Sequence, residues 1–341
     1  MSHRLLPRLA SVLVAAVLLA TAACSGARGG GEGDGISERE LVFAYITPET
    51  FPYHDGATRF KELIEEKSDG KITVKLYPGG QLGNEREINE SILDGTVHIG
   101  VGAGALAGLA PSVNLLELPF LIKDQDHMQR IVDSPVAEEL ARRIRDEGGF
   151  EVIGWFSTGD SAIQTVDRPI RTPADLDGLK LRSIENAALA DSLRILGANP
   201  TPMPFGEVYG GIQTGVITGA TLDWGSVYSL KLYELINYIT TPDVAFLAEP
   251  RPVIMSSEFW ETLSDAEQQL IREAMQEAAA YEREVFRTAQ QTAVDNIRAA
   301  GVEITDIDEQ AFMEAVRPAW DKWARELQAE DMLQTILELR G

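Results

Sequence analysis

The longest uninterrupted helical pattern in the chain is the strongest constraint on its fold. Ser264 and Glu267 have the spacing of a capping box, which marks the start of a helix. Because no Gly or Pro follows until Gly301, the helix is expected to continue for about 36 residues, or about 54 Å at 1.5 Å per residue. That length exceeds the width of one ordinary domain. We therefore predict that the helix spans two structural units.

Strand and helix patterns alternate along the rest of the chain, which is typical of an α/β fold with mostly parallel sheets. The 341 residues suffice for two domains of ordinary size, and 44% of them are hydrophobic, so a sizeable core can form. Strands are expected near 41–47, 72–77, 97–101, 151–156, 179–182, 251–256 and 302–305. Helices are expected near 58–68, 85–94, 135–147, 188–196, 309–328 and 330–339.

The first 23 residues have the pattern of an export signal. Arg4 and Arg8 form a positive start, and the apolar run 9–20 is shorter than the ~20 residues that a spanning helix needs. We therefore predict a signal peptide over residues 1–23 and an extracytoplasmic, periplasmic location. Residues 24–38 are expected to form a flexible tether, because the run 25–36 is rich in Gly and nearly free of apolar side chains.

Cys24 is the only cysteine of the chain. The segment Thr21–Cys24 resembles a lipobox, in which the cysteine is acylated after cleavage, although Thr21 stands where Leu is usual. The resemblance implies a lipoprotein held at the membrane by a lipid anchor on Cys24. The alternative is an ordinary cysteine that falls near a cleavage site. No disulfide can form within one chain in either case.

The charge of the chain excludes some partners. The formal net charge is −23, and removal of residues 1–23 would take away Arg4 and Arg8 and no acidic residue. Nucleic acids and anionic membrane surfaces repel such a protein. An anionic ligand would have to be held by local cations and by backbone N–H groups in a pocket.

Arg182 is the strongest candidate for such a cation. It ends the short alternating strand 179–182 and precedes the helical pattern that begins near Ala188. In open α/β sheets, ligands bind outside the carboxyl ends of the strands. The planar guanidinium can hold a carboxylate through two hydrogen bonds. The alternative is a surface ion pair with an acidic neighbour such as Asp177 or Glu185.

Several segments around Arg182 resemble the solute-binding proteins of tripartite ATP-independent periplasmic (TRAP) transporters. They are Gly178–Arg182, Leu196–Phe205, Glu207–Tyr209 and Gln213–Gly215, and two further matches are Tyr77–Glu87 and Leu118–Leu121 followed by Lys123, Asp124 and His127. The resemblance runs from about Leu41 to the last helix. It implies a periplasmic binding protein-like α/β fold, with two lobes, hinge strands and a long spanning helix. Lobe I would comprise 39–160 and 249–287, and lobe II 161–248 and 288–341.

The resemblance also assigns roles to residues. Arg182 would hold the ligand carboxylate and Phe205 would pack on its carbon skeleton. In the segment Thr221–Trp224 the chain departs from the family, because Leu222 stands where an Asn is common. Asp223 would then accept from a ligand hydroxyl or ammonium group, or it would only cap the next helix. Trp224 would stack on the ligand or belong to the core.

A second departure concerns the charge of the ligand. Ala162 stands where several acid-binding members carry another Arg, and Gln164 remains there as a neutral polar candidate. We therefore expect a ligand with one carboxylate and several hydroxyls or another neutral polar end. In lobe I, Glu87 could accept from a ligand hydroxyl or simply be a charge at a helix start. Tyr45 follows the first strand and is expected to face the cleft.

Nothing in the sequence favours catalysis. The four histidines are His3, His54, His98 and His127, and they form no zinc-type cluster. There is no nucleophile elbow and no nucleotide-binding motif. We predict a non-enzymatic binding protein without cofactor or metal, which passes a small organic acid to TRAP membrane permease subunits. The alternative is a sensor that presents the ligand to a membrane receptor kinase.

Overall fold

Two β-sheets organise residues 35–341, the part of the chain that the computed structural model describes. The first sheet has the order β2-β1-β3-β10-β4 and the second the order β11-β9-β5-β8-β6-β7. The first contains β1 (Arg39–Ala44), β2 (Ile72–Tyr77), β3 (Ile99–Val101), β4 (Phe150–Ser157) and β10 (Pro250–Ser256). The second contains β5 (Ser161–Thr165), β6 (Lys180–Ser183), β7 (Asn199–Pro202), β8 (Gly219–Asp223), β9 (Tyr238–Thr240) and β11 (Glu303–Thr305).

Both sheets are mostly parallel, as expected, and each contains one strand that runs antiparallel to its neighbours. In the first sheet β10 runs antiparallel to β3 and β4, and in the second β5 runs antiparallel to β8 and β9. The remaining pairs are parallel. β5 is the first strand of the second sheet after β4, and β10 is the first strand of the first sheet after β9. Each antiparallel strand therefore follows a point at which the chain crosses from one sheet to the other.

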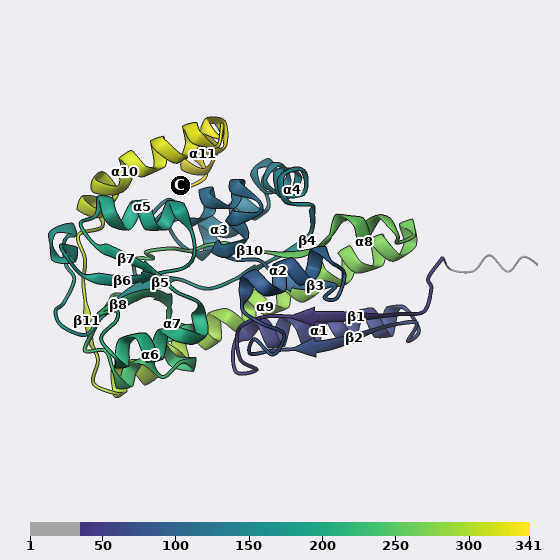
Figure 1. Cartoon of the computed structure of the whole chain (residues 1–341), viewed down its shortest axis with the longest axis horizontal. Helices are drawn as coiled ribbons and strands as arrows, with labels where there is room; N and C mark the ends of the chain where they lie inside the picture. The colour runs from purple at the N-terminus through teal and green to yellow at the C-terminus, as the bar shows by residue number, and fades with distance from the viewer. Residues whose placement is uncertain (1–34) are drawn as a thin grey trace, which may run out of the picture. The chain divides into compact units, whose positions relative to one another are not determined.

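Helices cover both sheets (Figure 1). They are α1 (Pro52–Lys67), α2 (Glu85–Leu93), α3 (Gln125–Val132), α4 (Pro135–Gly148), α5 (Ala187–Ile195), α6 (Val208–Gln213), α7 (Trp224–Ser229), α8 (Ser257–Glu261), α9 (Asp265–Ala299), α10 (Glu309–Glu326) and α11 (Glu330–Glu338). Short 3-10 helices occupy Gly104–Gly108, Pro111–Glu117, Pro173–Leu176, Phe205–Glu207 and Leu232–Glu234.

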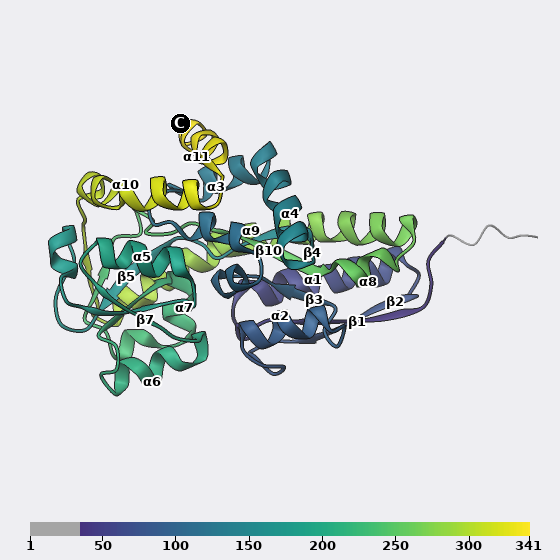
Figure 2. The ribbon, with the colours of Figure 1, turned by 45° about the horizontal axis from the view of Figure 1, so that its top comes forward.

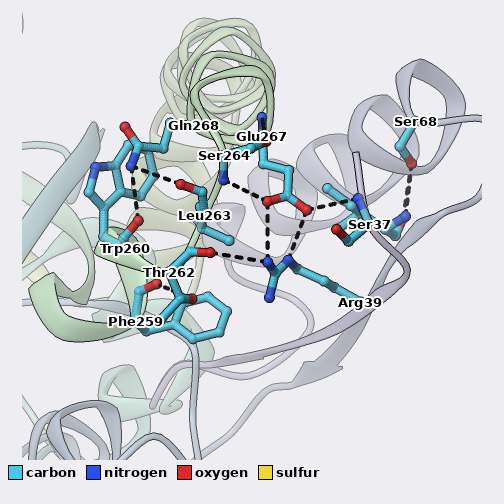
Figure 3. Close-up of polar contacts among 11 residues, drawn as sticks. Ser37, Arg39, Ser68, Phe259, Trp260, Thr262, Leu263, Ser264, Glu267 and Gln268 are labelled. Carbon is cyan, nitrogen blue, oxygen red and sulfur yellow. Dashed lines mark hydrogen bonds and ion pairs between the residues drawn. The ribbon is translucent and has the colours of Figure 1, made fainter. Parts of the chain in front are cut away.

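The predicted long helix is α9, with 35 residues. Its capping box is confirmed, since the Ser264 side chain accepts from the backbone N–H of Glu267 and the Glu267 carboxylate accepts from that of Ser264. The same carboxylate accepts from Ser37 N and from the guanidinium of Arg39 (Figure 3). The first strand is therefore tied to the start of α9.

α9 contributes to two separate hydrophobic cores. Ile271 and Met275 pack with β1, α1 and β10, whereas Val294 and Ile297 pack with β8, α6 and α7. Figures 1 and 2 show α9 extending from the side of α1 and α8 to that of α6 and α7. The prediction of two α/β lobes with a long spanning helix is confirmed. We call the elements around the first sheet lobe I and those around the second lobe II; the numbered boundaries given above stay a prediction.

A third hydrophobic cluster joins the two lobes, and we call it the apolar seam. Its members come from segment 115–122, α3 and α4 on one side and from α5, α10 and α11 on the other. Phe120 lies with its ring centroid 5.3 Å from that of Phe246 and 5.3 Å from that of Phe312. Trp320 Nε1 donates to Pro119 O at 2.9 Å. The seam thus combines aromatic packing with satisfied polar groups.

β7 contains Pro200 and Pro202, residues that are more typical of a turn than of a strand. The structure instead pairs it in parallel with β6. β7 is the last strand of the second sheet, and proline is tolerated on an edge strand because its missing N–H faces away from the ladder. α3 and β5 were not predicted either, since they are too short to show a clear period.

The predicted signal peptide, Cys24 and most of the predicted tether lie outside the described residues. Within residues 35–341, no helix combines the length and apolar character required to span a membrane. Strand β1 begins at Arg39, directly after the predicted end of the tether.

Candidate functional site

A cavity of about 80 Å³ lies between the two lobes. Lobe I contributes residues from the loop after β1, from α1, from β3 and from β10, and lobe II contributes residues from β6, β8 and the start of α7. The polar or charged side chains that line it include Tyr45, Thr47, Tyr53, Glu117, Thr158, Ser161, Arg182, Thr221, Asp223, Ser226, Glu249 and Arg251. The cavity therefore has walls from both lobes that combine apolar surface with several polar and charged groups.

Arg182 lies in β6, one residue before the carboxyl end of that strand, and its side chain is buried. Its Nε donates to Met203 O at 3.0 Å, and the structure gives its guanidinium no carboxylate within ion-pair distance among the described residues. Burial lowers the pKa of Arg182 to about 10, with Glu85 and Glu117 acting in the opposite direction. The guanidinium therefore remains positively charged at neutral pH.

A buried ion cluster forms another wall of the cavity. Arg251 donates from Nη1 to Glu117 Oε1 at 2.6 Å and from Nη2 to Glu249 Oε1 at 3.1 Å. Thr158 Oγ1 donates to Glu249 Oε2 at 3.2 Å. Burial opposes the charge of Arg251, but Glu117 and Glu249 raise its pKa above the ordinary value. Burial raises the pKa of Glu249 to about 7. Arg251 is thus already occupied by two carboxyl groups, unlike Arg182.

Four residues of the lining carry buried polar atoms that have no hydrogen-bond partner within the described part of the chain. They are Thr47 Oγ1, Glu117 Oε2, Thr221 Oγ1 and Arg251 Nε. A buried polar atom without a partner costs about 1–3 kcal/mol. Because these donors and acceptors surround one cavity, they indicate that a polar molecule satisfies them when the site is filled.

Asp223 has the helix-capping role that was one of the two predicted for it, and its contact with a ligand stays a prediction. It ends β8 and caps α7, since its carboxylate accepts from Ser226 N at 2.8 Å and from Ser226 Oγ. It also lines the cavity, and burial raises its pKa to about 6. The capping bonds hold the carboxyl group in place without preventing contact with a ligand.

Two other predicted residues also line the cavity. Phe205 stands at its edge in the 3-10 helix Phe205–Glu207. Tyr45 follows β1, and its hydroxyl is 2.7 Å from His54 Nδ1. Arg182, Phe205, Asp223 and Tyr45 are thus brought together in one cavity.

Three predicted residues lie outside the cavity lining. Gln164 is fully buried in β5 and uses its amide on Ala162 O, Leu222 O and Leu222 N. Trp224 is fully buried in the lobe II core. Glu87 caps α2 by accepting from Asn84 N at 2.8 Å. Sheet bonding accounts for Gln164 and helix capping for Glu87, while Trp224 packs in the core with its Nε1 unpartnered among the described residues. Cys24 lies outside the described residues.

Sequence reasoning missed the cluster of Glu117, Glu249 and Arg251. A signal was present, because Glu117 interrupts the apolar run 115–122 and Glu249 and Arg251 flank Pro250 at the start of a buried strand. Charged residues are rarely fully buried unless they are paired. A charged residue inside an apolar run therefore predicts a buried partner, although the sequence does not name it.

A second hollow of about 310 Å³ lies beside the cavity and shares Arg182 and Phe205 with it. It is lined by segment 79–85 and Ala105 from lobe I and by 184–185 and 203–207 from lobe II. We call this region, together with Gly104 and Asn186 at its edge, the cleft mouth. In the part of the chain that the structure describes, no group of His, Cys, Asp and Glu is placed to hold a metal ion.

Two α/β lobes that share one long helix and enclose a polar cavity define a solute-binding protein of the periplasmic type. Residues 43–326 match the model of bacterial extracellular solute-binding protein, family 7 (DctP), and the chain belongs to this TRAP-type family.

Relatives of known name agree with this assignment. The chain is 31% identical to the 2,3-diketo-L-gulonate-binding periplasmic protein YiaO of Escherichia coli, over 89% of this chain and 93% of that protein. It is 34% identical to the ectoine/5-hydroxyectoine-binding periplasmic protein UehA of Ruegeria pomeroyi, over 76% and 77%.

Solved structures show the same fold. A TRAP periplasmic solute-binding protein from Chromohalobacter salexigens with bound D-glucuronate has a TM-score of 0.83 and 30% identity, and the match covers 88% of this chain and 99% of that one. A Bradyrhizobium protein in complex with D-galacturonate has a TM-score of 0.83 and 28% identity, with 88% and 100% covered.

Proposed function

We propose that this protein binds a small organic acid with one carboxylate and several hydroxyls between its lobes and delivers it to a TRAP membrane permease. The observation that carries the proposal is Arg182: a buried, charged guanidinium lining an interlobe cavity, with one backbone carbonyl as its hydrogen-bond acceptor among the described residues. A ligand carboxylate would supply the negative charge that this positively charged guanidinium lacks as a partner.

The balance of charge in the cavity favours a single carboxylate. Arg251 is held by Glu117 and Glu249, so Arg182 is the guanidinium available to an acid. Asp223 and Glu249 would repel a second carboxylate once they are ionised. Ala162, where several acid-binding members carry an Arg, adds no cation. The site therefore favours monocarboxylates over dicarboxylates.

Hydroxyl groups fit the remaining wall of the cavity. A hydroxyl both donates and accepts, so it can serve Glu117 Oε2 as well as Arg251 Nε, the two unpartnered atoms of the ion cluster. Thr47 and Thr221 add further hydroxyl partners. Phe205 would pack against the carbon skeleton. The sugar acids bound by the similar solved proteins, D-glucuronate and D-galacturonate, have this chemistry.

The remaining parts of the proposal concern export and partners. Residues 1–23 would direct export and Cys24 would carry a lipid anchor, which places the protein at the outer face of a membrane. The sequence boundaries at 160/161, 248/249 and 287/288 would separate the lobes that close on the ligand. The proteins to which the chain is similar are binding proteins of transporters, which favours delivery over catalysis and gives no support to the sensor alternative.

Thermal unfolding with a panel of acids tests the proposal. The panel contains D-glucuronate, D-galacturonate, D-erythronate, succinate and malate. A bound acid at 100 times its Kd adds about 2.7 kcal/mol to the free energy of unfolding, which appears as a higher Tm. We expect sugar acids to raise the Tm and dicarboxylates to have little effect.

Arg182→Ala is the decisive variant. We expect it to weaken acid binding by more than about 100-fold, because a charge-assisted double hydrogen bond in a buried site is lost. Arg168→Ala is the matched control, since it removes a cation of the same lobe that lines neither hollow. Binding that survives in Arg182→Ala would contradict the assigned anchor, and a panel without any Tm shift would contradict the acid ligand.

A further inference from the structure

A contact between the lobes lies at the cleft mouth, directly after the proposed anchor residue in the sequence. On lobe II it is made by segment 184–186, which follows Arg182 and leads from β6 into α5. On lobe I it is made by Gly104, the first residue of the 3-10 helix after β3. The contact therefore connects the loop beyond Arg182 to the opposite wall of the cleft.

The approach of the two segments depends on the missing side chain at Gly104. A Cβ atom at this position would lie 2.5 Å from Ile184 Cγ2 and 3.2 Å from Asn186 Cβ. Both distances are shorter than ordinary van der Waals contact. The backbone of Gly104 is not in the left-handed region, so its own conformation does not require glycine. The requirement for glycine at this position comes from Ile184 and Asn186 of the other lobe.

Hydrogen bonds complete the contact. Asn186 Nδ2 donates to Gly104 O at 3.3 Å, while its Oδ1 caps α5 by accepting from Leu189 N at 2.9 Å. Asn114, in the 3-10 helix Pro111–Glu117, accepts from Ala188 N through Oδ1 at 3.2 Å. Two N–H groups in the first turn of α5 are thus satisfied, one by its own cap and one from outside the helix.

We propose that Gly104 and Asn186 form an interlobe latch, which is made when the cleft closes and broken when it opens. The latch deepens the proposed function by adding a closing contact that is separate from the ligand. Asn186 lies four residues after Arg182. The same short segment therefore holds the residue that would bind the ligand carboxylate and the residue that would close the mouth. A contact made only in the closed state shifts the population toward that state and raises ligand affinity accordingly.

Distance measurements between the lobes test the latch. The full chain would carry Cys24→Ser, and spin labels would be attached at Glu66→Cys in α1 and Gln213→Cys in α6, two exposed positions. Double electron–electron resonance would record the interlobe distance without ligand and with the panel acid that raises the Tm most. A closed cleft corresponds to the shorter distance.

Two alanine variants form a matched pair. Gly104→Ala places a methyl group against Ile184, whereas Gly108→Ala lies in the same 3-10 helix with no atom within 4 Å of the new Cβ. We expect Gly104→Ala to reduce the short-distance population and to weaken acid binding by about 10-fold or more, while Gly108→Ala changes neither. The double variant Gly104→Ala/Ile184→Ala removes the clashing methyl groups and is expected to recover most of the short-distance population.

The outcomes separate the latch from the proposed function. If no acid shifts the Tm, the proposed function fails, and the latch is judged on the ligand-free distances alone. A short-distance population that is lost in Gly104→Ala and regained in the double variant supports the latch. Equal distance distributions in wild type and Gly104→Ala overturn it, as does a wild-type protein that never shows the short distance. A lower ligand-free Tm in Gly104→Ala with unchanged distances would assign Gly104 to fold stability instead.

Discussion

The lobes meet at two places of opposite character, the apolar seam and the cleft mouth. The seam buries aliphatic and aromatic side chains, among them Phe120, Phe312 and Trp320. The mouth is a wide hollow crossed by a few polar contacts such as that between Asn186 and Gly104. Exposing the seam to water would cost about 25 cal/mol per Å² of apolar surface, whereas polar groups of the mouth exchange their partners for water at little net cost.

The difference indicates which side opens. We expect the seam to remain closed as long as the fold persists and to act as the pivot around which the mouth opens and closes. Figure 2 shows α10 and α11 on the seam side next to α3, remote from α2 and α6. Variants in the two regions should therefore differ in their effect on the opening equilibrium: those in the mouth change it, whereas those in the seam change only the free energy of unfolding.

The largest effect is expected from Phe312→Ala in the seam. Phe312 is fully buried against Phe120, and loss of a buried Phe side chain costs about 3–5 kcal/mol. Urea denaturation measures the loss, and Tyr281→Ala, which truncates an exposed aromatic residue of α9, is the control. A loss below about 1 kcal/mol, or a change in the interlobe distance without a loss of stability, would contradict the role of the seam as the stable contact between the lobes.

A smaller effect is expected from pH, with opposite sign in the two regions. At the mouth, burial raises the pKa of Glu85 to about 7, so its contribution to stability falls as the pH rises from about 4.5 to 7. In the seam, burial lowers the pKa of His127, so its contribution is lost as the pH falls below 6.5. His127 Nδ1 accepts from Lys123 N, a bond that protonation would remove.

Glu85→Gln isolates the contribution of the mouth. Gln can still accept from Ala103 N, as Glu85 does at 2.8 Å, but it cannot ionise. We expect this variant to exceed the wild type in free energy of unfolding at pH 8 by on the order of 1 kcal/mol, and to match it near pH 4.5. Urea titrations at both values measure this. An identical pH dependence in the two proteins would refute the role of Glu85.

The smallest effect is expected from Arg86→Ala. The ion pair between Arg86 and Glu185 crosses the mouth at 3.8 Å, with side chains 62% and 34% exposed. Exposed pairs contribute about 0–1 kcal/mol, and salt screens them. We expect acid affinity to change by less than about 3-fold, and a change above 10-fold would show that this pair belongs to the latch. Titration calorimetry at low and high salt makes the measurement.

The sequence predicted those features that depend on neighbouring residues. The cap and length of α9 follow from local pattern, Arg182 follows from its position at a strand end together with the family resemblance, and Asp223 follows from the resemblance. The buried ion cluster could not be predicted from the sequence. Two of its members, Glu117 and Arg251, are 134 residues apart along the chain. Gln164 and Trp224 lie close in sequence to cavity residues, but their side chains serve the sheet and the core, a difference that only the three-dimensional packing decides.

The shared helix α9 restricts how the lobes can move relative to one another. Its two ends are embedded in different cores, so the lobes cannot slide apart along its axis without breaking the helix or emptying a core. Rotation about the seam is the motion that remains. Closure on a ligand would then proceed mainly through this one rotation, and the contacts at the mouth would set its energy barrier. The rate of ligand release should accordingly respond to changes at the mouth far more than to changes of equal size along α9.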